Sequence, residues 1–566
     1  MNNLLSTIMD ENTPQFNKNV TEGASKEILR TAPDYLNSII ISGMKSVQDS
    51  VGLEYHGWRR LTPKEEFDKM FNNRDVKVIY DIAVSDLYMI ELRFTYKGSV
   101  LNRYLYMPYT SRGNLMNISN TPYHIVPVLS DTVISPNHKE VFVRLLRAKL
   151  IFKRVDRNFI VDSEKIPGQI IHADIYRTDN RTIQDNLGNV VPSISLYILG
   201  DVGFREALKK YAKITDVIVT LDGVDSYRNT HRVYESSKIK PRALKEFNYT
   251  GHDLKILVPK DQINEENVSF VDNFIFGILY TLDIFPESVY DLITLLNNHD
   301  TVDEKTYWRI ALGRIVFKNS FSIDRVSADM NDHFITLNSY VDTLIKGKLQ
   351  ESGVNVENFF DLLAVILVNY NTWLINSKAY NSDLNNRYMD ILYYLMYDII
   401  IGINKTLFDI NRKSSKKVLS EAEVVKMFNT NLSPKKIYSI VKSQGMNIAL
   451  MLADYTGDIM YPKITSTLED QSRGNGVKRG KQSSLPEAMK TLKGQDMFLG
   501  SLLFLSKSSN SPRFKSNLFM NYDLHSGRMM PSEQVLPKIK LLDELLLGRA
   551  GDNTKIRDTE LPPDID

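Results

Sequence analysis

The 566-residue chain is 43% hydrophobic and 24% charged, so it can build several packed cores, and this composition excludes a wholly disordered protein. Its length suggests about three or four domains. With 70 Lys and Arg against 68 Asp and Glu, it lacks the overall basic charge usual in proteins that bind nucleic acid alone, although a local basic patch is compatible with this balance. The absence of cysteine excludes disulfides, Cys-ligated zinc, iron–sulfur clusters and thiol nucleophiles.

The first half of the chain shows a helical pattern and then strand patterns. Leu36, Ile39, Ile40 and Met44 recur at helical spacing, which predicts a helix. After residue 76 the apolar period changes to two, and β-branched and aromatic residues predict strands. The expected strands span residues 77–98, 101–109, 123–134, 168–177, 191–199 and 214–224, and a short helix is expected over residues 205–213.

The second half is mainly helical and then becomes loop-like. Apolar stripes predict helices over residues 270–285, 288–300, 306–317, 337–348, 359–375 and 387–413. The apolar stretch 388–403 carries Asp390 and Asp398, and it is too short and too charged to span a bilayer. Because strands and helices do not alternate regularly, the order predicts an α+β multidomain protein and argues against a Rossmann or barrel enzyme.

No familiar catalytic motif occurs in the sequence. It has no Walker A motif, no GxGxxG after a strand, no GxSxG elbow, no HExxH and no EF-hand loop. The nine histidines are dispersed, and there is no Asp-x-Asp-x-Asp cluster. Asp454 and Asp458 have a minimal metal-site spacing, but a helix end beside Gly457 explains them better. The chain is therefore expected to supply no catalytic residue and to bind no metal.

Three polar segments near the end of the chain combine features suited to phosphate. Residues 473–481 hold three glycines and no acid, and their cations are Arg473, Lys478, Arg479 and Lys481. Cations attract phosphate and glycines allow a close backbone approach, although a solvated surface loop is the alternative. The second segment, 506–517, is polar and contains Arg513 and Lys515, and taken alone it predicts a turn. The third spans residues 521–533.

The third segment carries a resemblance to a known family. Its sequence, NYDLHSGRMMPSE, resembles the HYGRICPIETPEG motif of the β subunit of multisubunit RNA polymerases. The matching positions are His525, Gly527, Arg528, Pro531 and Glu533. Upstream and in the same order, residues 106–120 resemble the β sequence MTDRGTFIINGAERVIVSQ, and residues 382–387 (SDLNNR) resemble DHLGNRR. The SALGPGG run of the β subunit has no recognisable counterpart in this chain. It resembles the amino-terminal half of a split β subunit of the type found in giant (jumbo) bacteriophages.

The resemblance implies a domain arrangement. A β subunit begins with a protrusion into which a lobe is inserted, and it continues into a fork near the active centre. The corresponding assignment is protrusion-like for residues 1–145 and 305–430, lobe-like for the inserted residues 146–304, fork-like for residues 431–540, and a C-terminal tail for residues 541–566.

The resemblance also implies roles for single residues, none of them catalytic. Arg387 matches an arginine that lies beside the non-template strand, and the cations of residues 473–481 would bind nucleic acid. Three further cations would lie near the RNA–DNA hybrid or the active-centre wall: Arg513, Lys515 and Arg528. His525 and Glu533 would support the active centre, with Glu533 orienting a cation because phosphate repels a carboxylate.

The implied protein works only within a complex. It would be a noncatalytic subunit of a phage DNA-directed RNA polymerase, inactive when isolated, with no cofactor of its own and with Mg²⁺ on a β′-type partner. Expected partners are the C-terminal β half, β′-type subunits, DNA and RNA, with a promoter-specificity subunit as a further candidate and no membrane. The expected location is the host cytoplasm, free or packaged in the virion. The alternatives are a phage structural or assembly protein without nucleic-acid enzymology and an RNA-binding accessory protein.

Overall fold

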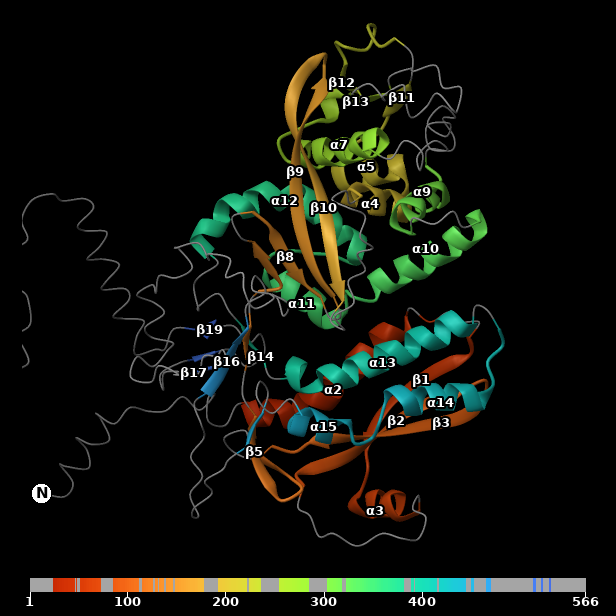
Figure 1. Ribbon diagram of the computed structural model, residues 1–566, viewed down its shortest axis with the longest axis vertical. Coiled ribbons are helices and arrows are strands. Elements are labelled where there is room, and N and C mark those ends of the chain that lie inside the picture. The colour runs from red at the N-terminus through yellow and green to blue at the C-terminus, as the bar shows by residue number, and fades with distance from the viewer. Residues whose placement is uncertain are drawn as a thin grey trace, which may run out of the picture.

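The computed structural model places most of the first 443 residues and short strands beyond them (Figure 1). The described residues are 24–45, 47, 51–72, 85–110, 115–125, 128–130, 132–136, 139–145, 148–177, 192–220, 223–235, 254–284, 303–317, 322–380, 388–390, 392–414, 417–443, 449–451, 465–469, 513–515, 521–522 and 529–530. Helices and separate, mostly antiparallel sheets make up this part of the chain, which confirms the α+β class.

The lower unit in Figure 1 is a small sheet covered by helices. The sheet has the antiparallel order β1-β2-β3, and its strands are Leu53–Arg60, Leu87–Tyr96 and Ser99–Pro108. The helices of this unit are α2 (Ala24–Met44), α3 (Pro63–Asn72), α13 (Leu392–Ser414), α14 (Glu421–Asn431) and α15 (Lys436–Ser443). Two of these helices come from the start of the chain and three from beyond residue 390. The lower unit is therefore completed by segments that follow the upper unit in the sequence.

The upper unit is built on a seven-stranded sheet with the order β11-β13-β12-β9-β8-β7, in which β10 also pairs with β9. Its strands are β7 (Ile134–Pro136), β8 (Val141–Arg144), β9 (Ala148–Val161), β10 (Glu164–Arg177), β11 (Ile218–Thr220), β12 (His231–Glu235) and β13 (Lys255–Pro259). Its helices are α4 (Ile194–Val202), α5 (Phe204–Ala212), η4 (Lys260–Gln262), α7 (Val268–Ile284), α9 (Lys305–Phe317), α10 (Ile323–Asn338), α11 (Thr343–Glu351) and α12 (Phe359–Tyr380). Helices α9 and α12 contact α4, and α12 also contacts α7.

Three small sheets complete the described structure. One has the order β14-β6-β16-β17, with strands Tyr388–Asp390, Val128–Ser130, Thr465–Glu469 and Arg513–Lys515. Another has the order β15-β5-β4, with strands Ala449–Met451, Thr121–Ile125 and Leu115–Ile118. The last pairs β18 (Asn521–Tyr522) with β19 (Met529–Met530).

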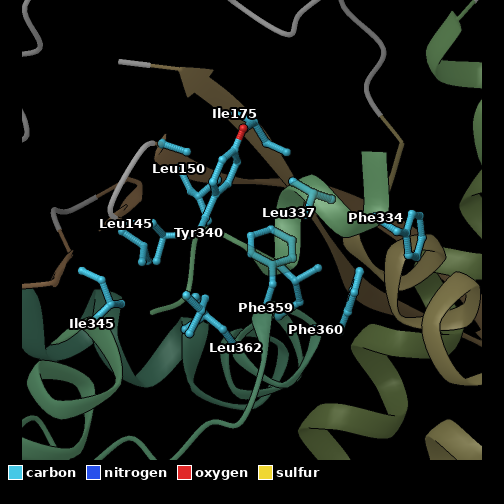
Figure 2. Close-up of a cluster of buried hydrophobic side chains, with 14 of the residues drawn as sticks. Leu145, Leu150, Ile175, Phe334, Leu337, Tyr340, Ile345, Phe359, Phe360 and Leu362 are labelled. Carbon is cyan, nitrogen blue, oxygen red and sulfur yellow. The ribbon is translucent and has the colours of Figure 1, made fainter. Parts of the chain in front are cut away.

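Buried apolar side chains of both units form one continuous cluster. Figure 2 shows its part where α10, α11 and α12 meet the long strands: Tyr340 lies beside Leu150 and Ile175, and Phe360 lies beside Phe334, with ring centroids 4.8 Å apart. Tyr340, Phe359 and Phe360 are at most 1% exposed. Burying one such side chain contributes about 1.5–3 kcal/mol, so this contact holds the helices firmly on the sheet.

Three sequence predictions about local structure are wrong. The helix expected over residues 387–413 begins instead with strand β14 (Tyr388–Asp390), and only α13 (Leu392–Ser414) is helical. Residues 191–199 were expected to form a strand, but Ser193 caps helix α4 by accepting a hydrogen bond from the Ser195 N–H at 3.3 Å. This helix is buried nearly all round, and such a continuous apolar run does not distinguish a strand from a buried helix. The helix expected over 337–348 is interrupted, because the Asp342 side chain caps a new helix by accepting from the Ile345 N–H at 2.8 Å.

The junction between α4 and α5 depends on a glycine. Gly203 has φ +93°, and a Cβ built there would lie 2.4 Å from the Asp303 backbone oxygen. Gly203→Ala should therefore lower the free energy of unfolding by about 1–3 kcal/mol, measured by urea titration. The control is Gly347→Ala in α11, where a Cβ meets nothing within 4 Å. Alanine there should raise stability by about 0.5–1 kcal/mol, and equal losses in both variants would contradict the explanation.

A partly buried histidine in α10 predicts a loss of stability in mild acid. Desolvation of the imidazole lowers the pKa of His333 to about 4. Below about pH 6.5 the unfolded chain therefore binds a proton that the folded chain excludes, and stability falls as the pH falls. This group alone should remove about 2 kcal/mol between about pH 7 and pH 5, measured by urea titration at each pH. His333→Gln should show a correspondingly weaker pH dependence, and an unchanged dependence would contradict the assignment.

Candidate nucleic-acid interface

The four-stranded sheet β14-β6-β16-β17 brings together strands that are far apart in the sequence. Strand β14 pairs with β6 antiparallel, with Met389 opposite Leu129. Strand β16 pairs with β6 in parallel, with Leu468 opposite Leu129, and it pairs with β17 antiparallel. Because neighbouring strands lie about 4.8 Å apart, segments near residues 129, 389, 467 and 514 lie within about 15 Å of one another.

This sheet contains or adjoins most of the segments for which the sequence predicts nucleic-acid binding. Arg513 and Lys515 are the end positions of β17, where they pair with Thr467 and Thr465 of β16. Arg387 directly precedes β14 in the sequence, and the basic segment 473–481 follows β16 within a few residues. Arg387 and the cations Arg473, Lys478, Arg479 and Lys481 lie outside the described residues.

The motif that carries the resemblance brackets the smallest sheet. Asn521 pairs with Met530, and Tyr522 pairs with Met529. His525 and Arg528 fall between these two strands in the sequence, and Glu533 follows them; all three lie outside the described residues. The antiparallel pairing places the strand near the end of the motif beside the strand at its start. The roles assigned to these residues stay predictions.

An ion pair fixes the edge strand of the four-stranded sheet to α11. Lys348 Nζ lies 2.6 Å from Asp390 Oδ2, and the two side chains are 18% and 12% exposed. The other carboxylate oxygen of Asp390 accepts the Tyr393 N–H at 3.1 Å, at the start of α13. A carboxylate with two such partners in a mostly buried site holds strand β14, helix α11 and helix α13 in one geometry.

Two tyrosines and further charged groups lie near this ion pair. The Arg144 guanidinium of β8 lies 5.2 Å from the Tyr393 ring centroid. Burial raises the pKa of the Tyr35 hydroxyl in α2, and the nearby Asp342 and Asp390 carboxylates raise it further, so Tyr35 stays neutral. Elements of the lower unit, the upper unit and the four-stranded sheet therefore meet here. No sequence pattern singled out Lys348, and the one signal for Asp390 was a carboxylate inside an apolar stretch.

A second basic feature lies on the lower unit, where a groove of about 640 Å³ separates α13 from α14. Its lining residues are Lys405, Asp409, Lys413, Lys417, Leu419, Glu423, Lys426, Met427, Thr430 and Asn431. This groove was not predicted from the sequence. The available signal was the spacing of Lys405 and Lys413, which are eight residues apart and therefore lie on the same side of one helix.

Two features concern the described part of the chain: side-chain groups that could hold a metal ion and helices that could cross a bilayer. Within it, no group of three or more His, Asp or Glu side chains is arranged to hold a metal ion. No helix among the same residues is both long and apolar enough to cross a bilayer. The segment 388–403, notable in the sequence for its apolar character, instead contributes strand β14 and the first part of α13.

Comparison with protein families gives a match over most of the chain. A family model with the description nvRNAP_subunit, non-virion RNA polymerase subunit, matches residues 1–519. The match includes both units, the four-stranded sheet and the basic segment 473–481, and it ends just before β18. A comparison with curated proteins finds no match.

Proposed function

The chain belongs to the non-virion RNA polymerase subunit family, and from this premise we propose that it is the amino-terminal half of a split, noncatalytic β-type subunit. Membership makes it a subunit of a phage multisubunit RNA polymerase, and it favours this function over that of a structural or assembly protein. The observation that supports a β-type role most strongly is the four-stranded sheet. It places β17, with Arg513 and Lys515, next to β16, which precedes the basic segment, and in the same sheet as β14, which follows Arg387.

The proposed role of the cations is to hold the phosphates of DNA and of the RNA–DNA hybrid. Arginine suits this role because its planar fork binds phosphate or carboxylate through two hydrogen bonds. Arg387 is proposed beside the non-template strand, and Arg513, Lys515 and Arg528 near the hybrid. His525 and Glu533 are proposed to support the active centre. The cations Arg473, Lys478, Arg479 and Lys481 are proposed to bind nucleic-acid backbone.

Catalysis is proposed to belong to the assembled enzyme and not to this chain alone. A β′-type partner would hold Mg²⁺ through its carboxylates, and the metal would stabilise charge at the transferring phosphate. Other proposed partners are the C-terminal β half and a promoter-specificity subunit. The family description, which names a polymerase outside the virion, favours action in the host cytoplasm over packaging in the particle.

The domain assignment is proposed in the same terms. Residues 1–145 and 305–430 would be protrusion-like, 146–304 the inserted lobe, 431–540 fork-like and 541–566 the tail. Packing between helices adds one detail to this division. Helices α9 and α12, which it assigns to the protrusion, contact α4 of the lobe-like segment, and α13 contacts α2.

The experiment that tests the proposed function is recovery of the tagged chain from infected cells. Mass spectrometry identifies the associated proteins, and primer extension on an RNA–DNA scaffold with Mg²⁺ measures their activity. We expect β′-type chains and a C-terminal β half to copurify with RNA synthesis, and the chain alone to be inactive. Recovery with virion structural proteins and no synthesis would overturn the proposal.

A further inference from the structure

The groove between α13 and α14 has a positive charge that ion pairs leave partly uncompensated. Its lining contains four lysines against Asp409 and Glu423. Glu423 is engaged by Lys417, whose Nζ lies 2.5 Å from Oε1, and this ammonium and the Ser420 backbone N–H lower the pKa of Glu423 to about 2. The remaining lysines are exposed and form no ion pair with the described part of the chain: Lys405, Lys413 and Lys426.

The two helices hold these lysines at a fixed spacing. Lys405 and Lys413 are eight residues apart on α13, which places them about 12 Å apart along the helix axis. One strand of a DNA duplex rises about 3.4 Å per nucleotide, so this distance matches about three to four phosphates. Lys426 approaches from α14 across the groove. The wall between them is rigid, because a capping box at Ser420 and Glu423 begins α14 and the Tyr96 hydroxyl donates to the Leu419 carbonyl at 2.9 Å.

The chemistry of the lining indicates which polyanion fits. Proteins that bind single strands stack the bases on aromatic rings, and none of the described lining residues is aromatic. Base-specific recognition commonly uses the planar fork of arginine, and the described lining holds four lysines and no arginine, with one amide, Asn431. Lysines act as point charges that contact phosphate regardless of sequence. The groove floor, Leu419 and Met427, offers no group that would read a base edge.

We propose that the α13–α14 groove binds the phosphate backbone of duplex DNA without sequence preference, through Lys405, Lys413 and Lys426. This site is separate from the residues of the proposed interface at β17 and around Arg528. The inference rests on the proposed polymerase function, because that function supplies the duplex that flanks the transcribed region. The groove would hold this duplex on the lower unit, between α13 and α14, and so extend the surface over which enzyme and template touch.

The test measures how salt affects duplex binding by the full-length chain. A labelled duplex of mixed sequence is titrated at several KCl concentrations by fluorescence anisotropy, and the variant carries Lys405→Gln, Lys413→Gln and Lys426→Gln. Removing one lysine–phosphate pairing lowers the slope of log K against log salt by about 0.9, so the slope should fall by about 2–3 and affinity should fall roughly tenfold or more near 0.1 M salt. The control variant removes the same charge from exposed lysines of the upper unit: Lys165→Gln, Lys209→Gln and Lys213→Gln.

The possible results of this test distinguish a failure of the groove proposal from a failure of the proposed polymerase function. Equal slopes for the groove variant and the control variant, or no duplex binding by the parent chain, would overturn the groove. The groove variant could instead lose affinity only for single-stranded DNA, or only for an acidic protein segment that competes for the groove. Either result would show that duplex DNA is not the ligand. RNA synthesis by the assembled enzyme on a scaffold without duplex arms should be the same with the groove variant. The proposed function fails independently, if no polymerase partner copurifies.

Discussion

Replacing Arg528 by alanine should lower RNA synthesis by the assembled polymerase about 10- to 100-fold without unfolding the chain. The resemblance places Arg528 in the motif beside the active centre, between β18 and β19 in the sequence. A charge-assisted hydrogen bond in a water-poor site contributes about 1.5–3 kcal/mol, and about 1.4 kcal/mol changes a rate tenfold. Primer extension on an RNA–DNA scaffold measures the rate, and circular dichroism checks the fold.

Two further variants make this result specific. Arg325→Ala removes an arginine on α10 that is 64% exposed and lies 3.9 Å from Asp329, and it should leave RNA synthesis unchanged. Arg528→Lys keeps the charge but loses the planar fork, so its rate should lie between those of the parent and the alanine variant. Equal synthesis by Arg528→Ala and by the parent would remove Arg528 from the proposed interface.

Replacing Lys348 by methionine should destabilise the chain by about 3–5 kcal/mol, the usual result of leaving one partner of a buried ion pair unpaired. Lys348 Nζ lies 2.6 Å from Asp390 Oδ2, and the Asp390 side chain is only 12% exposed. The methionine keeps most of the apolar stem of lysine and removes only the charge. Because Asp390 ends β14, RNA synthesis by the assembled enzyme should fall as well. Urea unfolding of the purified chain measures the stability.

The same helix supplies a matched control. Lys346 pairs with Glu357 at 3.6 Å, but these side chains are 30% and 90% exposed, so Lys346→Met should cost less than about 1 kcal/mol. Combining Lys348→Met with Asp390→Leu removes both charges and should recover part of the stability. If the two lysine variants are equally stable, the buried ion pair does not anchor the strand.

Local patterns predicted many elements because neighbouring residues determine them. The spacing of Leu36, Ile39 and Ile40 predicted the helix that is now α2, and all three side chains are at most 1% exposed. The strand predicted over 101–109 corresponds to β3, and the described part of the strand predicted over 77–98 contains β2. These strands pair throughout and turn at Lys97 and Gly98 with positive φ. Such a hairpin needs only alternation and a permissive turn, both of which the sequence displays.

Local sequence patterns could not predict which distant strands pair with each other. Strand β14 has three residues and its neighbour β6 lies more than 250 positions earlier in the chain, so neither segment carries a local signal for the other. The parallel pairing of β6 with β16 is of the same kind. The groove was missed for a related reason: Lys405 and Lys413 belong to α13 and Lys426 to α14, and only the packing of these helices brings them into one groove.

The cations of the candidate interface were identified by composition and by resemblance, and the structure adds a framework for some of them. Arg513 and Lys515 fall on a strand of the four-stranded sheet, which no periodicity had indicated. Arg387 and the basic segment 473–481 adjoin the same sheet in the sequence. The resemblance contributed the order of these segments along the chain, and the pairing of β14, β6, β16 and β17 contributed their proximity.

The most direct test of a β-type role is crosslinking from the RNA itself. The assembled enzyme is placed on a scaffold whose RNA carries 4-thiouridine within the hybrid, and the crosslinked peptides are identified by mass spectrometry. A β-type role predicts crosslinks to residues 506–517, around Arg513 and Lys515, and to the motif that holds Arg528. Crosslinks confined to the partner subunits, in an enzyme that extends the RNA normally, would contradict it.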